Sequence, residues 1–226
     1  MKKEDLALFL GMLCGDGHLS IHNKKRVLKK GLETYHDYCT GFCNTNEKIM
    51  KLFSELFYKL FKVKGNFYPR ERPNRKRIYE FNSYSNAVFD EISSLGFPIG
   101  VKKDVLKIPS IISNGSHQEK LNFFFGLLLT DGCIRKNKTM IFHSGSKLLL
   151  EDLSNLIEDL FKIKKEVKSY TQKERYTSYQ LNLNKEETRR ILSVPPSHNG
   201  IAPVLSLWEN ISLPDLLFLN KEKANK

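Results

Sequence analysis

The pattern of hydrophobic and polar positions contains two long apolar runs that each end at an acidic residue. The runs cover residues 4–14 and 118–129 and are rich in residues that favour helices. The first continues into GMLCGDG (11–17) and the second into GLLLTDG (126–132). Apolar residues at this spacing predict two helices, and each helix is expected to end at a carboxylate.

Each apolar helix is followed by a similar succession of alternating and amphipathic stretches. Alternating basic segments predict hairpins, and amphipathic segments preceded by Asn44 and Thr45, or by Ser144 and Ser146, predict capped helices. The first copy is expected to contain a hairpin at 17–42, a helix at 46–61, a hairpin at 65–85 and a helix at 86–95. The second is expected to contain a hairpin at 132–142, a helix at 147–161, a hairpin at 166–184 and a helix at 185–194.

The two successions are interpreted as copies of one unit, because similar residues recur at constant offsets. Asp16 and Asp131 are 115 positions apart. The stretches LFKVK (60–64) and LFKIK (160–164) are 100 positions apart. The fall in offset from 115 to 100 indicates 15 extra residues in the first hairpin of the first copy.

The duplication and the element order predict the fold class. We expect an α+β fold of two pseudo-symmetric α-β-β-α-β-β-α repeats. The expected boundaries are 1–97 for the first repeat, 98–117 for a linker, 118–195 for the second repeat and 196–226 for a C-terminal extension. Pro69 and Pro73 lack the N–H group that a central strand donates, so a strand near them is expected to be bulged or at a sheet edge.

The composition favours a polyanionic partner. The 226 residues include 37 Lys and Arg against 25 Asp and Glu, which gives a net charge of +12. Neutralising phosphates releases condensed counterions, so this excess favours nucleic acid as a partner. The four cysteines form no C-x-x-C pair and the six histidines show no ligand spacing, which disfavours zinc chemistry. The absence of a long apolar run and of a signal-peptide cleavage site predicts an intracellular protein without a membrane partner.

Small residues on the two apolar helices indicate that these helices pack together. Gly11 and Gly15 are four positions apart, as are their counterparts Gly126 and Thr130. Small residues at this spacing let two helix backbones approach closely, as is best documented in membranes.

Helix packing of this kind would bring the two repeated carboxylates together. A single Asp between glycines at a helix end is usually turn chemistry. Asp16 and Asp131 instead occupy matched positions of a duplicated unit. Two close carboxylates repel each other, and Mg²⁺ relieves this repulsion with hard oxygen ligands. Paired metals about 4 Å apart are a recurring arrangement for phosphodiester hydrolysis, so the sequence predicts a nuclease.

The two motifs also resemble those of a known family. FLGMLCGDG (9–17) and FFGLLLTDG (124–132) resemble the paired motifs of single-chain LAGLIDADG homing endonucleases. The resemblance extends over about residues 4–195 and includes KIPSII before the second motif. It implies that the motif helices form the interface between the repeats and that the strands form a saddle over DNA. It also implies a monomer that cleaves both strands of a long duplex site and leaves short 3′ overhangs.

The resemblance further implies a metal centre on the last acidic residue of each motif. Asp16 and Asp131 would bind Mg²⁺, with Mn²⁺ or Ca²⁺ as substitutes. The backbone carbonyls of Gly15 and Thr130 would be supporting ligands.

A basic residue near each centre is expected to assist catalysis. Lys185 is one candidate, and its counterpart in the first repeat is Ser85, so the two centres are expected to differ. Arg135 is another candidate. Cys14 and Leu129 stand where relatives often carry a further Asp, but that position does not bind the metal.

Basic residues of the four hairpins are the predicted contacts with DNA, where strand ribbons fit the major groove. They are Lys24, Lys25, Arg26, Arg70, Arg72, Arg75, Lys76, Arg77, Arg135, Lys136, Lys138, Lys173 and Arg175. The longer first hairpin predicts asymmetric contacts and a non-palindromic site. Ordinary solvated hairpin tips are the alternative interpretation of any one of these residues.

Three functions remain open at this point. The first is a site-specific double-strand DNA endonuclease. The second is a maturase that binds intron RNA. The third is a DNA-binding regulator that uses the same fold without cleavage, although the presence of both Asp residues favours the endonuclease.

Overall fold

The computed structural model describes residues 2–28, 31–71, 73, 76–172 and 176–194. The first repeat consists of α1 (Lys3–Asp16), β1 (Gly17–Leu28), β2 (Gly31–Asn44), α2 (Glu47–Phe61), β3 (Asn66–Arg70), β4 (Ile78–Ser83) and α3 (Asn86–Ser94). The second consists of α5 (His117–Asp131), β5 (Gly132–Ile134), β6 (Met140–Ser144), α6 (Lys147–Phe161), β7 (Lys168–Gln172), β8 (Tyr176–Leu183) and α7 (Lys185–Leu192). The short helix α4 (Ser110–Ser113) lies between them. The predicted α+β fold with two α-β-β-α-β-β-α repeats is confirmed.

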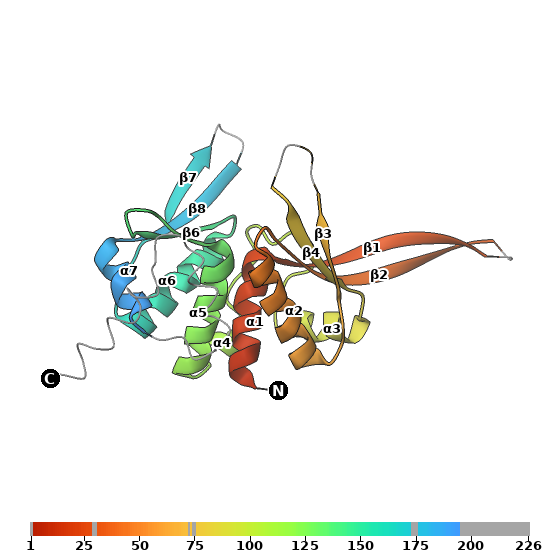
Figure 1. The fold of residues 1–226 in the computed structure, drawn as a ribbon, viewed down its shortest axis with the longest axis horizontal. Helices are drawn as coiled ribbons and strands as arrows, with labels where there is room; N and C mark the ends of the chain where they lie inside the picture. The colour runs from red at the N-terminus through yellow and green to blue at the C-terminus, as the bar shows by residue number, and fades with distance from the viewer. Residues whose placement is uncertain (1, 29–30, 72, 74–75, 173–175, 195–226) are drawn as a thin grey trace.

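Each repeat contains a four-stranded antiparallel sheet with its helices on one face. The strand orders are β1-β2-β4-β3 and β5-β6-β8-β7, so the second sheet repeats the topology of the first. Pro69 lies in β3, which is an edge strand, as expected for a residue that cannot donate to a neighbouring strand. Figure 1 shows the two sheets side by side in the upper part of the molecule and the helices below them. Helices α1 and α5 lie next to each other in the middle, where the two repeats meet.

The helix starts follow local capping chemistry. The Asn46 side chain accepts hydrogen bonds from the backbone N–H groups of Lys48 and Ile49 and caps α2. Ser146 caps α6 in the same way through the N–H of Leu149. The expected caps Asn44 and Thr45 of the first repeat are therefore wrong by one to two positions, and Asn44 has another role at the site.

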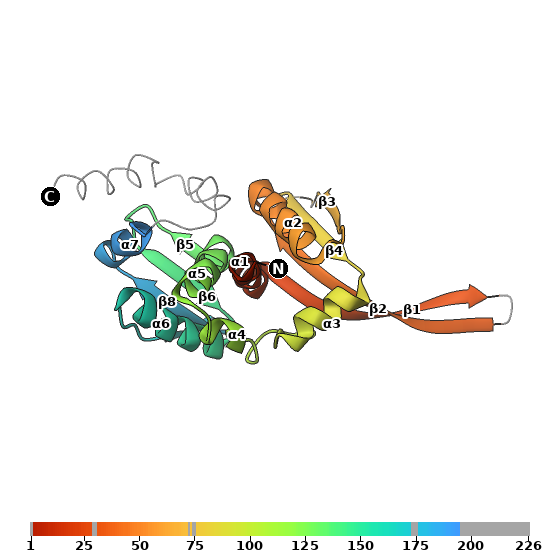
Figure 2. The same ribbon diagram turned by 90° about the horizontal axis from the view of Figure 1, so that it is seen from below.

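The motif helices α1 and α5 are the centre of the core. Both are buried along most of their length, and both pictures show them side by side (Figures 1 and 2). A methyl group at Gly11 would overlap the backbone of Phe123, and one at Gly126 would overlap the backbone of Leu8. The two helices thus touch backbone to backbone, as the spacing of small residues predicts.

The two repeats differ most in their first hairpin. Strands β1 and β2 form twelve pairs, from Gly17 and Phe42 to Leu28 and Gly31, whereas β5 and β6 form three, from Gly132 and Phe142 to Ile134 and Met140. Only the last part of β2, from Thr40 to Asn44, also pairs with β4. The rest is a two-stranded ribbon that projects from the molecule (Figure 1). The extra residues of the first copy are in this ribbon.

Within the described part of the chain, no helix combines the length and the apolar character needed to cross a bilayer.

Candidate metal centre and nucleic-acid interface

The two motif carboxylates occupy the last positions of the paired helices. Asp16 ends α1 and Asp131 ends α5. A methyl group at Gly15 would overlap the Thr130 side chain and would lie 3.3 Å from the Asp131 backbone nitrogen. The C-terminal ends of the two helices therefore meet. These helix ends are on the side of the molecule where the sheets lie (Figure 1).

The glycines after these carboxylates are required by space rather than by a left-handed backbone. Gly17 and Gly132 have φ angles of −89° and −85°, which any residue adopts. A side chain at Gly17 would overlap Leu13, and one at Gly132 would overlap Leu128. At each Asp-Gly pair the chain thus passes directly from a buried helix into a strand. The glycine is not needed for a turn with positive φ, which is the usual reason for Gly after a helix.

Asn44 fixes the carboxylate of the first repeat. Its side-chain amide at the end of β2 donates a 2.6 Å hydrogen bond to Asp16. Its own oxygen accepts a 2.7 Å hydrogen bond from the backbone N–H of Asn46, which sets the orientation of the amide. The corresponding residue of the second repeat is Ser144, whose hydroxyl oxygen accepts a 3.1 Å hydrogen bond from the N–H of Ser146. The two centres are therefore supported by different chemistry.

Lys102 is a basic residue at the site that the sequence analysis missed. It comes from the segment between the repeats, and its ammonium group donates hydrogen bonds of 2.9 Å to the Cys14 carbonyl and 2.5 Å to the Gly15 carbonyl. It lines a cavity of about 260 Å³ together with Gly15, Asp131 and Ser144. The only signal in the sequence was the pair Lys102 and Lys103 within the apolar stretch GVKKDVLKIP.

Burial and mutual charge shift the pKa values of these groups. Burial raises the pKa of Asp131 from 3.8 to about 7, with the Asp16 charge acting in the same direction and Lys102 against it. Burial also raises the pKa of Asp16, opposed by the Asn44 hydrogen bond and by Lys102. Burial lowers the pKa of Lys102, and Asp131 is its strongest opposing influence. The neighbouring Cys14 thiol is buried, which raises its pKa to about 12 and makes a thiolate ligand unfavourable.

This donor set fits a hard divalent cation. Two carboxylates are held at the meeting point of two helix ends, and the Cys14 and Gly15 carbonyls already accept hydrogen bonds from a cationic group. Oxygen donors of this kind suit Mg²⁺ and Ca²⁺. The described residues contain no group of three or more His, Cys, Asp or Glu that could hold a metal, so a cation here would rely on backbone oxygens. The Thr130 hydroxyl donates hydrogen bonds to the Gly126 and Leu127 carbonyls. The backbone carbonyl is therefore the oxygen of Thr130 that is available to coordinate a cation.

The other catalytic candidates lie elsewhere. Lys185 is the exposed first residue of α7 and does not line the cavity beside Asp131. Figures 1 and 2 place α7 at the outer end of the second repeat, away from α1. Arg135 is exposed after β5 and lines a separate cavity with Gln180 and Asn182.

Four of the predicted DNA contacts form ion pairs. Lys24 pairs with Asp37, and three arginines pair with glutamates at 2.5–2.9 Å: Arg26 with Glu33, Arg70 with Glu80 and Arg77 with Glu71. Lys25, Lys76, Arg135, Lys136 and Lys138 are exposed. Arg72, Arg75, Lys173 and Arg175 lie outside the described residues.

Strand alternation sorts the basic residues of the long ribbon between its two faces. Leu19 is buried against the helices, so Lys25, six residues further along β1, shares the helix side of the ribbon. Lys24 and Arg26 share the opposite face.

The face opposite the helices also carries a polar cluster. On β3 and β4, Tyr68 donates a 3.1 Å hydrogen bond to Glu80 and accepts one of 2.8 Å from Asn82. Arg70 donates to the same glutamate at 2.9 Å. Arg, Asn and Glu are side chains that read base edges in the major groove, so this cluster suits a nucleic-acid interface.

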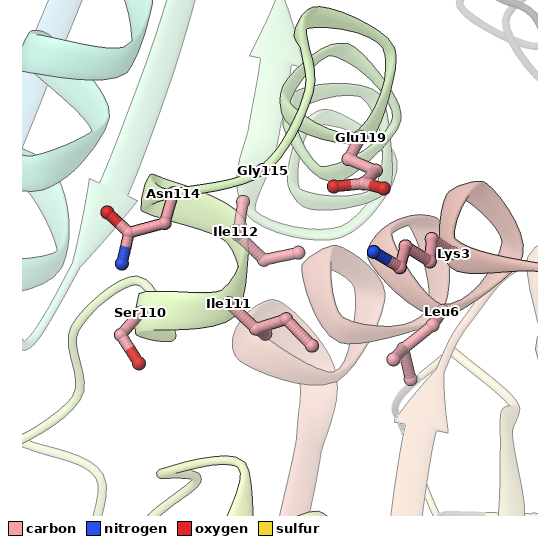
Figure 3. A pocket seen from close by; sticks show the side chains of 8 residues that line it. All are labelled: Lys3, Leu6, Ser110, Ile111, Ile112, Asn114, Gly115 and Glu119. Atoms are coloured by element: carbon pink, nitrogen blue, oxygen red, sulfur yellow. The ribbon is translucent and has the colours of Figure 1, made fainter.

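A second cavity of about 300 Å³ lies at the opposite ends of the motif helices (Figure 3). Lys3 of α1, Glu119 of α5 and residues of α4 line it. The Glu119 carboxylate accepts a hydrogen bond from the Ser116 N–H in the capping box of α5 and so has a structural role there. This cavity does not bring together groups that would perform chemistry.

Comparisons with known proteins agree with this architecture. The family model described as a LAGLIDADG-like domain matches residues 118–194. The replication factor C small subunit of Methanocaldococcus jannaschii (strain ATCC 43067 / DSM 2661 / JAL-1 / JCM 10045 / NBRC 100440) is 30% identical over 151 residues, which are 66% of this chain. The match spans 7% of the length of that curated relative.

Two solved structures have the same fold over most of the chain. I-DmoI in complex with DNA and Ca is similar with a TM-score of 0.60 and 19% identity, covering 89% of this chain and 97% of that chain. The homing endonuclease I-WcaI bound to its DNA recognition sequence is similar with a TM-score of 0.56 and 16% identity, covering 90% of this chain and 83% of that chain. The chain thus has the two-repeat fold of the single-chain LAGLIDADG homing endonucleases, and its residues 118–194 match the model of a LAGLIDADG-like domain.

Proposed function

We propose that this protein is a site-specific endonuclease that hydrolyses both strands of duplex DNA with divalent cations. The observation that carries the proposal is the pairing of Asp16 and Asp131 at the meeting ends of two pseudo-equivalent helices. An excess of positive charge and a fold shared with DNA-bound homing endonucleases support the same function. Because the chain carries both repeats, one molecule is sufficient to form both centres, and we propose that it acts as a monomer.

The residues around the helix ends have distinct roles in this proposal. Asp16 and Asp131, with the carbonyls of Gly15 and Thr130, hold the cations; Mg²⁺ is the expected ion, and Mn²⁺ or Ca²⁺ can take its place. A bound divalent cation stabilises the negative charge that develops on the attacked phosphate and makes water a better nucleophile. Asn44 orients the Asp16 carboxylate through the 2.6 Å hydrogen bond. Lys102 is the proposed assisting basic residue instead of Lys185 or Arg135, which is supported by its hydrogen bonds to the Cys14 and Gly15 carbonyls and by the cavity that it shares with Asp131.

The sheets supply the DNA interface. Exposed basic side chains would neutralise phosphates, and the cluster of Tyr68, Arg70, Glu80 and Asn82 would read base edges. The long ribbon of β1 and β2 extends this interface on one side only. The target site is therefore expected to be long and non-palindromic, and cleavage of the two strands on either side of the helix pair is expected to leave short 3′ overhangs.

Selection of cleaved sites from a randomised duplex library in the presence of Mg²⁺ tests this function. The expected result is a single enriched site, cut on both strands by the wild-type protein. Asp16→Asn and Asp131→Asn should each abolish double-strand cleavage while specific binding to the selected site persists. Cleavage by either variant at the wild-type rate would refute the metal centre. Binding without cleavage by the wild type would instead indicate a DNA-binding regulator.

A further inference from the structure

The ammonium group of Lys102 contacts the oxygens that a cation in the centre would also use. It donates to the Cys14 and Gly15 carbonyls in the last turn of α1. The last carbonyls of a helix have no partner within the helix and carry partial negative charge, so they attract cations. The last turn of α1 contains no basic residue of its own, and Lys102 supplies the positive charge from a segment 87 positions away in the chain.

Asp131 is the second group that Lys102 faces. Both residues line the same cavity, and the Asp131 carboxylate is the strongest charged influence on the ammonium. The ammonium group is thus hydrogen-bonded to the end of α1 and shares a cavity with the half-buried Asp131 of the other repeat. A second positive ion placed there would experience strong repulsion in this partly desolvated position.

The two copies of the unit differ in sequence at this position. At the offset of 100 that relates the later parts of the repeats, the position equivalent to Lys102 is Ala202. The sequence contains no Lys or Arg between Arg190 and Lys221. The second copy of the unit therefore carries no equivalent lysine at this point of the sequence.

We propose that the Lys102 ammonium is a built-in substitute for one of the two cations. In the metal-free protein it occupies the site that the Asp131 carboxylate and the Gly15 carbonyl form, and a divalent cation must displace it to bind there. This inference rests on the proposed metal centre and adds to it that the two cation sites differ in affinity because one of them is already occupied by a side chain.

Two opposite consequences of removing the lysine follow. Without the ammonium, Asp16 and Asp131 repel each other without compensation, so the metal-free protein loses stability. The same change removes the need for displacement, so a divalent cation binds the vacated site more tightly. A lysine that only assists the reaction from beside the cation would not produce this second effect.

Calcium binding without DNA tests the inference. Isothermal titration and thermal unfolding would compare the wild type with Lys102→Met and with Lys107→Met, which removes the same charge from an exposed position of the same segment. In the wild type, Ca²⁺ must break the hydrogen bonds of the charged Lys102 ammonium before it binds. Lys102→Met has no such bonds to break, so it should bind Ca²⁺ on the order of tenfold more tightly at one site. It should also unfold at a lower temperature in chelator and show a larger stabilisation by Ca²⁺. Lys107→Met should match the wild type in both respects.

Unchanged or weaker Ca²⁺ binding by Lys102→Met would overturn the inference. If the wild type still cleaves its selected site, that result leaves the proposed function intact. If the wild type cleaved no selected site, that result would instead contradict the proposed endonuclease function.

A measurement on the wild type covers the case in which Lys102→Met does not fold. With ¹³C-labelled lysine side chains, Ca²⁺ should shift the NMR signal of Lys102 and leave that of Lys107 in place. A Lys102 signal that does not respond at saturating Ca²⁺ would also overturn the inference.

Discussion

Asn44 and Ser144 occupy equivalent positions, but only Asn44 donates a side-chain hydrogen bond, of 2.6 Å, to the motif carboxylate of its repeat. The Ser144 hydroxyl oxygen accepts from the Ser146 N–H instead. The carboxylate of the first repeat is therefore held by a rigid amide, while that of the second lies beside the cavity of Lys102. This difference predicts that the two strands of a target are cut by two centres whose carboxylates are held by different groups.

Asn44→Ala should slow the cutting of one strand much more than the other. The variant loses a hydrogen bond to a charged group, which is worth about 1.5–3 kcal/mol, so the affected strand should be nicked at least tenfold more slowly. Duplexes labelled on either strand measure the two rates separately. Ser144→Ala is the matched control, and it should slow neither strand by a comparable factor. Equal slowing of both strands by Asn44→Ala would argue against independent centres.

Gly126→Ala should destabilise the protein strongly. The added methyl group would overlap the backbone of Leu8, and backbone atoms cannot move aside without separating α1 from α5. Overpacking of a core typically costs about 1–3 kcal/mol, and this contact should lie at or above the upper end. Denaturant unfolding measures the change. Gly145→Ala is the control, since a methyl group there would lie 3.4 Å from a flexible lysine side chain and should change the free energy of unfolding little.

The raised pKa of Asp131 predicts a pH dependence of metal-free stability. Between pH 3.8, the ordinary pKa of an aspartate, and about pH 7, Asp131 of the folded protein holds a proton that the unfolded chain has released. Stability from this group is therefore present at low pH and is lost as the pH rises through this window, by up to roughly 4 kcal/mol. Asp131→Asn has no titratable group at this position, so its stability lacks this pH dependence. In chelator, the wild type should thus become progressively less stable than Asp131→Asn between pH 4 and about 7.

Parallel unfolding curves of both proteins across this pH range provide the measurement. A constant difference would show that Asp131 titrates normally. Divalent cations should reverse the trend above pH 7, because the deprotonated carboxylate is the form that binds them.

The faces of the long ribbon predict which lysines and arginines contact phosphates. Log affinity for target DNA should fall linearly with log salt, and Arg26→Ala should reduce the slope by about one. Lys25→Ala should have a smaller effect, because strand alternation places this residue on the helix side. Glu33→Gln should steepen the slope, since it releases Arg26 from its 2.9 Å ion pair. If all three variants had the same salt slope as the wild type, the ribbon would not approach the DNA.

The sequence was sufficient for the architecture because a duplication doubles every local signal. Two apolar helices with small residues four apart, each ending in Asp-Gly, predicted both the helix pair and the meeting of Asp16 with Asp131. Sequence offsets also located the extra length in the first hairpin, and the structure has twelve pairs there against three in the second repeat.

The supporting groups of the site could not be predicted because their contacts are long-range. Lys102 reaches carbonyls 87 and 88 positions earlier, and no periodicity or spacing records such an encounter. Asn44 looked like a helix cap, since Asn near a helix start usually is one. Asn46 performs that role two residues later and leaves Asn44 to turn toward Asp16. Local propensity identified the correct type of residue at the wrong position.

The ribbon of β1 and β2 has a consequence for how target preference can change. Its outer residues, such as those at 21–26, are exposed and contribute to no core. New side chains there cost the fold little, whereas changes near the helix pair meet close-packed backbone. The outer flank of the target on the side of the first repeat is therefore the part whose recognition can drift fastest, while the centre of the target stays tied to the architecture that cuts it.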